Sequence, residues 1–241
     1  MRYLTCFILL LIYVENLAQS SGQPIAIVEL FTSQGCSSCP SADRVLREAV
    51  NSSTTKGEIY GLSFHVSYWN RLGWKDPYSS EQFTERQKWY AKKMHLNRIY
   101  TPQMIVDGKV EFVGSQKDKL RTALKSSFVY NKKSEIAISN LKRTKGQLQL
   151  VYSSQNITQN GVVNVAVVQK TASNHVSRGE NRNKTLVHSN VVRAFYTSPI
   201  KNMDQIEFDL PQLSDQSEYE VVIYVQNPHT LKISAVTKVT L

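Results

Sequence analysis

Residues 28–40 read V-E-L-F-T-S-Q-G-C-S-S-C-P and combine an apolar run, a short polar turn and a C-x-x-C pair. The apolar run starts at Ile25 and contains one acid, a pattern typical of a strand buried on both faces of a sheet. Gly35 permits a sharp turn, and from Ser41 onward apolar residues recur at helical spacing on one side. The sequence therefore predicts a strand, a turn and a helix, with Cys36 at the start of that helix.

This position favours thiol chemistry. The free N–H groups and the dipole of a helix N-terminus stabilise a thiolate, which is the form of cysteine that attacks disulfides. Cys36 is the predicted nucleophile, and Cys39, one helical turn on, is predicted to resolve a mixed disulfide by attacking Cys36. A structural disulfide and half of a zinc site are the alternatives. Zinc usually needs two more Cys or His ligands, and the only other cysteine, Cys6, lies in a segment expected to be removed.

Residues 1–20 have the features of a secretory signal peptide: a basic start, an apolar core and small residues near the end. Cleavage is expected after Ala18 or Ser20. The apolar run from Cys6 to Val14 is too short to span a bilayer, although a retained anchor is the alternative. We therefore expect an exported protein, periplasmic or secreted, in a compartment where a disulfide can persist.

The formal net charge is +10, from 29 Lys and Arg against 19 Asp and Glu. Such a balance could favour nucleic acid or anionic membranes. The basic residues are scattered in pairs, however, without a basic run or a nucleic-acid motif, which indicates a solvated basic surface and no nucleic-acid partner. No later segment approaches membrane-spanning length, so we expect no stable membrane insertion after signal removal.

The rest of the first half alternates strands and helices. A second strand is predicted over residues 59–66, and Ser79, with Gln82 three positions later, is predicted to cap a helix that runs to His95. Pro102 precedes two short strands that flank Asp107-Gly108, a strong hairpin signal. A last helix is expected over residues 115–128.

This order, with a C-x-x-C pair and a Thr-Pro before a hairpin, resembles the thioredoxin fold. The resemblance implies that Cys36 and Cys39 carry thiol–disulfide exchange while Pro102, in a cis bond, lies against them. It also implies that the backbone of Thr101 pairs with an extended substrate chain.

Three longer motifs carry a closer resemblance. Residues 28–43 read V-E-L-F-T-S-Q-G-C-S-S-C-P-S-A-D, residues 64–78 read F-H-V-S-Y-W-N-R-L-G-W-K-D-P-Y, and residues 100–108 read Y-T-P-Q-M-I-V-D-G. They resemble an exported bacterial family catalogued as domain of unknown function 1223, over essentially the whole mature chain. Ser67 stands where that family's pattern has an aspartate. The family name implies a thioredoxin-like fold and no settled reaction.

Glu29 is the only acid in the first apolar run. If buried, it could accept the Cys39 proton during exchange. The alternative is that it points to a sheet edge and pairs with a lysine, because spacing alone does not fix its face.

Three further side chains are candidates for substrate binding: His65, Trp69 and Trp74. His65 ends the second strand, where it could tune the Cys36 thiolate, ligate copper with the two sulfurs, or serve as a hydrogen-bonded structural residue. The two tryptophans could wall a substrate groove or pack their own segment on the sheet.

The second half is predicted to be all β. Short alternating or β-branched runs, separated by polar turns, suggest a β-sandwich, and they lie at residues 136–141, 148–152, 162–168, 187–192, 206–210, 219–225 and 231–239. The predicted organisation is a signal peptide (1–20), a thioredoxin-like α/β domain (21–131) and an all-β sandwich-like domain (132–241). Glu180, Asn181 and Arg193 are predicted to form a polar network beside the thiol site, although a loop that satisfies its own backbone is the alternative.

The sequence thus favours an exported thiol–disulfide oxidoreductase that acts on protein or peptide thiols and disulfides without a cofactor or metal. Two alternatives remain. One is a secreted binding module with a structural disulfide, and the other is a copper carrier using Cys36, Cys39 and His65.

Overall fold

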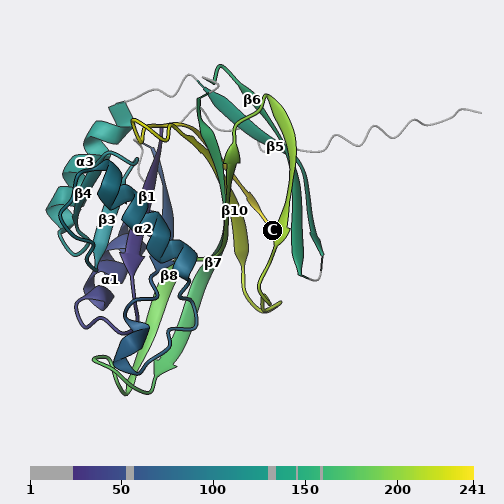
Figure 1. Ribbon diagram of the computed structural model, residues 1–241. Coiled ribbons are helices and arrows are strands. Elements are labelled where there is room, and N and C mark those ends of the chain that lie inside the picture. Colours follow the sequence, from purple (N-terminus) through teal and green to yellow (C-terminus); the bar gives the residue numbers. More distant parts are fainter. Residues whose placement is uncertain (1–23, 53–56, 130–133, 145, 158–159) are drawn as a thin grey trace, which may run out of the picture.

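The computed structural model describes residues 24–52, 57–129, 134–144, 146–157 and 160–241. The predicted signal peptide and the predicted domain boundary at 131/132 lie outside these residues, so both stay predictions. The described chain is mostly β, with three α-helices and two sheets (Figure 1). Within it, no helix is both long and apolar enough to cross a membrane.

The first half contains four strands and three helices in the order expected from the sequence. Strand β1 pairs in parallel with β2, β3 pairs antiparallel with β1, and β4 closes the hairpin. Asp107 and Gly108 form the predicted turn with positive φ angles of 49° and 70°. The elements are β1 (Ile25–Thr32), α1 (Cys39–Asn51), β2 (Glu58–His65), α2 (Glu81–Lys93), β3 (Gln103–Val106), β4 (Val110–Val113) and α3 (Lys117–Val129).

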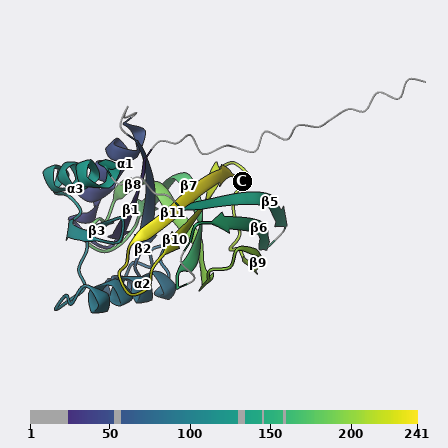
Figure 2. The same ribbon diagram turned by 90° about the horizontal axis from the view of Figure 1, so that it is seen from above.

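Alternation along β1 decides which helix covers which face of the sheet. Val28 and Leu30 pack with residues of α1 and α3, whereas Ile27 and Phe31 pack with residues of α2. Figure 2 shows α1 and α3 on one side of these strands and α2 on the other. Glu29 therefore faces α2 and not α1.

The sheet continues into the second half of the chain. Its eight strands run β11-β10-β7-β8-β2-β1-β3-β4, and β8 joins β2 in parallel through the pair Ser63 and Val191. The amide of Asn190 reinforces this junction by donating to the carbonyl of Gly61 at 3.1 Å. The added strands are β7 (Val162–Val176), β8 (Lys184–Pro199), β10 (Tyr219–Gln226) and β11 (Ile233–Thr240).

The remaining strands form a small antiparallel sheet, β5-β6-β9. Apolar residues of β6 and β9 pack against inward-facing residues of β7 and β10, so two sheets enclose a second core. All seven predicted strands of this half are thus found, divided between the two sheets. The small sheet consists of β5 (Glu135–Thr144), β6 (Gln147–Gln155) and β9 (Met203–Asp209).

One predicted helix boundary is wrong. Ser80, not Ser79, caps α2: its hydroxyl accepts a hydrogen bond from the backbone N–H of Gln82 at 3.2 Å. The Ser79 hydroxyl instead donates to the carbonyl of Asp76 at 2.7 Å, which shapes the loop before the helix. The prediction was off by one residue, because the loop geometry selects the second of two adjacent serines.

Candidate functional site

Cys36 and Cys39 form a disulfide where β1 turns into α1. Helix α1 begins at Cys39, with Pro40 in its first turn, and the N–H of Cys39 donates to the carbonyl of Cys36 at 3.2 Å. Both cysteines are buried, with 1% and 0% of their surface exposed. Cys36 is therefore next to a helix N-terminus, as predicted, but closed off from solvent.

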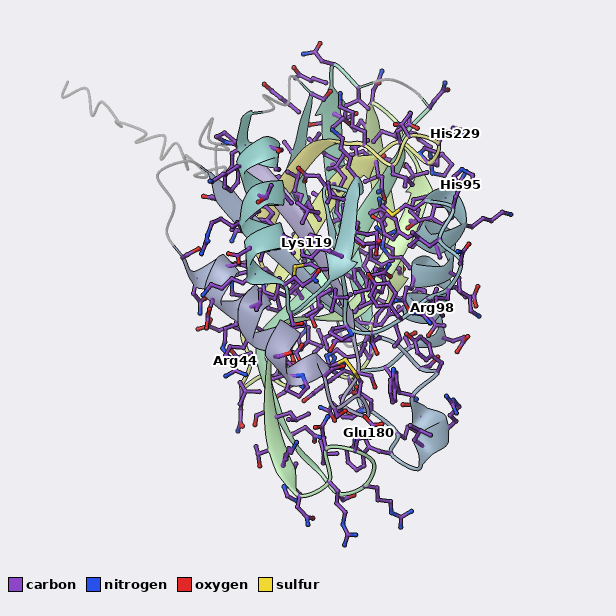
Figure 3. The ribbon with its side chains drawn as sticks, turned by 90° about the vertical axis from the view of Figure 1, so that its left-hand side faces the viewer. Arg44, His95, Arg98, Lys119, Glu180 and His229 are labelled. Atoms are coloured by element: carbon purple, nitrogen blue, oxygen red, sulfur yellow. A yellow bond between two sulfur atoms is a disulfide. The ribbon has the colours of Figure 1, made fainter. Side chains whose placement is uncertain are left out.

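The loop between β7 and β8 reaches over the cysteines, and we call residues 177–183 the covering loop. A carboxylate oxygen of Glu180 accepts a hydrogen bond from the N–H of Ser37 at 2.8 Å. The amide of Asn181, which is fully buried, donates to the carbonyls of Gln34 and Cys36 at 2.9 Å each. Hydrogen bonds to the side chain and N–H of Ser37 lower the pKa of Glu180. Figure 3 shows Glu180 near the disulfide.

The Thr101–Pro102 segment lies beside the same turn. The bond between these residues is cis, as the thioredoxin resemblance implies. The indole N–H of Trp69 donates to the Thr101 hydroxyl at 2.7 Å, and a Cβ added to Gly35 would lie 3.2 Å from the Cβ of Trp69. The structure thus brings Trp69 and Thr101 together next to the cysteine turn.

Pro102 also lies near α1. A Cβ added to Gly114 would be 2.9 Å from the Cβ of Ala42 and 3.4 Å from the Cβ of Pro102. Because Ala42 is in the first turn of α1, this places Pro102 at the cysteine end of the helix.

Trp74 belongs to a buried polar network centred on Gln34. The Gln34 side-chain oxygen accepts from Trp74 Nε1 and Asn174 Nδ2, both at 3.0 Å. Its amide nitrogen lies 3.2 Å from Nε2 of His188, and its backbone N–H donates to Asp76 at 2.8 Å. Gln34 thus ties the cysteine turn to residues from three distant segments.

Two histidine–aspartate pairs lie buried next to Gln34. Nδ1 of His65 is 2.7 Å from Oδ2 of Asp76, Nδ1 of His188 is 3.2 Å from Oδ2 of Asp43, and the two imidazole rings are 4.6 Å apart. Burial lowers the pKa of His65, but the carboxylates of Asp76 and Asp43 together raise it by more, so the net shift is upward. Burial raises the pKa of Asp76, but His65 and the backbone N–H groups of Gln34 and Tyr78 together lower it by more, so the net shift is downward. His65 is therefore buried and hydrogen-bonded, which fits the third of its predicted roles, that of a structural residue.

Glu29 has a different set of partners from the one predicted. Arg86 of α2 binds its carboxylate through Nε and Nη2, both at 2.7 Å, and the hydroxyls of Tyr90 and Tyr224 donate to it at 2.8 and 3.2 Å. β1 is an interior strand, so the lysine pairing at a sheet edge is wrong. Among the described residues, the hydrogen-bond partners of Glu29 do not include a cysteine, and its role as proton acceptor stays a prediction.

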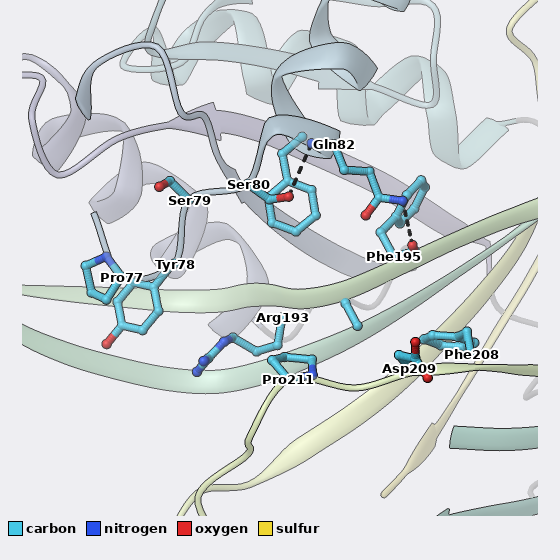
Figure 4. Close-up of a pocket in the computed structure, with 12 residues that line it drawn as sticks. Pro77, Tyr78, Ser79, Ser80, Gln82, Arg193, Phe195, Phe208, Asp209 and Pro211 are labelled. Atoms are coloured by element: carbon cyan, nitrogen blue, oxygen red, sulfur yellow. Dashed lines mark hydrogen bonds between the residues drawn. The ribbon is translucent and has the colours of Figure 1, made fainter. Parts of the chain in front are cut away.

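Arg193 does not join Glu180 and Asn181. Its guanidinium lies 5.2 Å from the ring centre of Tyr78 and donates to the side chain of Gln169. It lines a cavity of about 370 Å³ between the start of α2, β8 and residues 208–211 (Figure 4). The predicted network is therefore right for two of its three members.

The structure gives no support to the copper site. Within the described ranges, no three His, Cys, Asp or Glu side chains are arranged to hold a metal ion. His65 uses Nδ1 to bind Asp76.

Comparison with known proteins places the chain in a family. Residues 27–226 match the model described as "Protein of unknown function (DUF1223)". The chain belongs to this family. A search of curated proteins finds no match for this DUF1223 protein.

Two solved structures resemble this DUF1223 protein over most of its length. Protein AGR_C_4864 from Agrobacterium tumefaciens is 26% identical, with a TM-score of 0.58, over 90% of this chain and 93% of its own. HBP35 of Porphyromonas gingivalis is 14% identical, with a TM-score of 0.60, over 92% of this chain and 77% of its own, a likeness that concerns the fold alone.

Proposed function

We propose that this DUF1223 protein is an exported thiol–disulfide oxidoreductase whose first half is thioredoxin-like. One observation carries the proposal: the Cys36–Cys39 disulfide lies between a parallel strand and a helix N-terminus, at the end of the helix where Pro102 also lies. Backbone N–H groups at such a position favour a thiolate. The Thr101–Pro102 segment supplies backbone beside it that an extended substrate could pair with.

In the reducing direction, the Cys36 thiolate attacks a disulfide of a protein or peptide, forms a mixed disulfide and expels one substrate sulfur as a thiolate. Cys39 then attacks Cys36, so that the Cys36–Cys39 bond forms and the second substrate thiolate leaves. Two electrons pass from the cysteine pair to the substrate. The oxidising direction is the reverse of these steps.

Burial of Cys36 makes access part of the proposal. With 1% of its surface exposed, Cys36 meets a protein substrate only after the covering loop moves. The bond between Glu180 and Ser37 is at the exposed rim, where water can replace it, whereas Asn181 is fully buried. We propose that opening proceeds from Glu180 inward.

The same burial favours a second candidate, a secreted binding module in which the disulfide is structural. Buried disulfides that resist the glutathione pool have potentials below about −300 mV, whereas catalytic ones lie higher. The two candidates therefore differ in a measurable quantity.

The deciding experiment equilibrates the mature protein with dithiothreitol or glutathione couples and traps free thiols. A potential above about −300 mV, with a mixed disulfide trapped on Cys36 in a Cys39→Ser variant, is expected for the oxidoreductase. A lower potential together with an unreactive Cys36 would select the structural disulfide. Cys36→Ser, which removes the nucleophile and keeps Cys39, is the matched control.

Export rests on the pattern of residues 1–20. Expression of the full chain in a bacterium and sequencing of the mature N-terminus tests it. A start after Ala18 or Ser20 in the periplasm or medium is expected, and an intact N-terminus in the cytoplasm would contradict it.

A further inference from the structure

Asp43 is a buried carboxylate on the same face of α1 as Cys39. The two residues are four apart, so their side chains are neighbours on the helix surface. Asp43 is 4% exposed and Cys39 is 0% exposed. Oδ1 of Asp43 has no hydrogen-bond partner among the residues that the structure describes, although polar atoms at this depth are normally paired.

His188 is the charged or polar neighbour nearest the other oxygen of this carboxylate. The side-chain oxygen of Gln34 accepts from Trp74 and Asn174, so its nitrogen is the donor toward Nε2 of His188. A neutral His188 that accepts at Nε2 carries its proton on Nδ1, which lies 3.2 Å from Oδ2 of Asp43. This is ion-pair distance without hydrogen-bond geometry, so His188 lies beside Oδ2 of Asp43, and Oδ1 is left open.

The other buried carboxylates near β1 and β2 have no open oxygen of this kind. Each oxygen of Asp76 accepts a hydrogen bond, one from the N–H of Tyr78 and the other from Gln34 and His65. Both oxygens of Glu29 accept from Arg86, on the far face of the sheet. Asp43 alone among these three combines burial, an open oxygen and the helix face of Cys39.

We propose that Asp43 accepts the proton of the Cys39 thiol during exchange and that His188 is the residue that positions it. The inference rests on the proposed exchange reaction and assigns its proton step. It assigns to Asp43, with a histidine from the other half of the chain, the role that the sequence raised as one possibility for Glu29.

In the mixed disulfide, the Cys39 S–H transfers its proton to Oδ1 of Asp43, and the resulting thiolate attacks the sulfur of Cys36. The Cys36–Cys39 bond forms as the bond between Cys36 and the substrate sulfur breaks, and the substrate leaves as a thiolate that takes a proton from water. Asp43 returns its proton to water before the next cycle.

The charges around Asp43 suit this role. His188 lies on one side, the His65–Asp76 pair lies behind it, and Tyr78 contacts both imidazoles. Asp43 and Arg193 both influence the pKa of His65, the first raising it and the second lowering it. A proton that reaches Asp43 therefore enters a buried polar centre and not an apolar core.

The test separates the two attacks of the exchange reaction. Reduced protein is mixed with an aromatic disulfide whose thiolate is coloured: the first thiolate is released when Cys36 attacks and the second when Cys39 attacks. Asp43→Asn is expected to slow the second release at least about tenfold near pH 6 and to spare the first, because it removes only the general base. Glu48→Gln, the same chemical change at an exposed site of α1, is the control and leaves both unchanged.

The pH profile distinguishes proton transfer from a merely structural role. With Asp43 in place, the rate of the second thiolate release is expected to stay nearly constant from about pH 8 to pH 6. Without it, the rate falls about tenfold per pH unit below about 8.5, the ordinary pKa of a free cysteine. Variant and wild type converge above that pH, which a general disturbance of packing would not produce.

Each outcome bears on the proposal. An Asp43→Asn protein with a normal second release near pH 6 overturns it. If that variant does not fold, a wild-type second release that already falls tenfold per pH unit overturns it equally, and slowing by His188→Gln supports it. A wild type that releases no first thiolate shows that the proposed function itself is wrong, and the assignment of Asp43 falls with it.

Discussion

Glu29 and Arg86 form a buried ion pair in which each charge depends on the other. The Arg86 guanidinium also lies among the rings of Phe64, Trp89, Tyr90, Phe195 and Tyr224, at 4.6 to 5.9 Å. Burial lowers the pKa of Arg86, but Glu29, Tyr224 and Tyr90 together raise it by more, so the guanidinium stays charged. Loss of the carboxylate would leave that charge without its counter-ion.

Glu29→Gln is therefore expected to lower the free energy of unfolding by about 3–5 kcal/mol, the usual cost of breaking a buried pair from one side. Urea denaturation at neutral pH measures it. Glu85→Gln, which removes an exposed partner of Lys88, is the control, with an expected change below about 0.5 kcal/mol. Equal effects of the two substitutions would mean that other groups compensate the buried charge of Arg86 when Glu29 is lost.

The sequence singled out Glu29 but missed its partner. The available signal was Arg86 itself, since it lies between Phe83 and Tyr90 on the apolar side of its helix, where a lone cation needs a buried anion. Asp43 and His188 gave no such signal. Their proximity depends on a strand pairing that spans more than half of the chain.

The covering loop is expected to control how fast reductants reach the disulfide. Glu180→Ala removes the acceptor of the Ser37 N–H at the exposed rim, which favours local opening. Reduction of the disulfide by dithiothreitol is expected to be about three to ten times faster, because one charge-assisted hydrogen bond is lost from the closed state. Thiol trapping over time measures it.

Arg178→Ala, an exposed change in the same loop, is the control and leaves the rate unchanged. Asn181→Ala, which frees the carbonyls of Gln34 and Cys36, is expected to act in the same direction as Glu180→Ala. If neither Glu180→Ala nor Asn181→Ala speeds reduction, access is limited by some other element, such as the segment of Trp69.

Local patterns were enough to predict the strands, the helices and the hairpin at Asp107-Gly108. The predicted polar network also placed Glu180 and Asn181 beside the cysteines. Local patterns did not indicate that β7 and β8 extend to 15 and 16 residues. This length brings the covering loop to the start of α1. Strand length there depends on the partner strand and on Asn181 docking, which are tertiary interactions that no local period encodes.

The junction of β2 and β8 makes one sheet out of strands from both predicted domains. A single bridge between Ser63 and Val191 joins them, and buried contacts reinforce it on both faces. On the α1 face, His188 meets Asp43 and Gln34; on the α2 face, Tyr224 meets Arg86 and Glu29. Buried charged groups of the first half thus take further partners from the second, which argues that the two halves fold as one cooperative unit.

Equilibrium unfolding tests this cooperativity, because all three tryptophans, Trp69, Trp74 and Trp89, lie in the first half. Tryptophan fluorescence therefore reports on the first half, whereas far-UV circular dichroism reports mainly on strands of both. We expect the two urea transitions to coincide in midpoint and slope. Glu29→Gln is expected to move both midpoints together, because the Glu29–Arg86 pair is bound by Tyr224 from the second half. Two separate unfolding transitions would contradict this, if Glu29→Gln moved only the midpoint measured by fluorescence. The halves would then be independent domains with a weak interface.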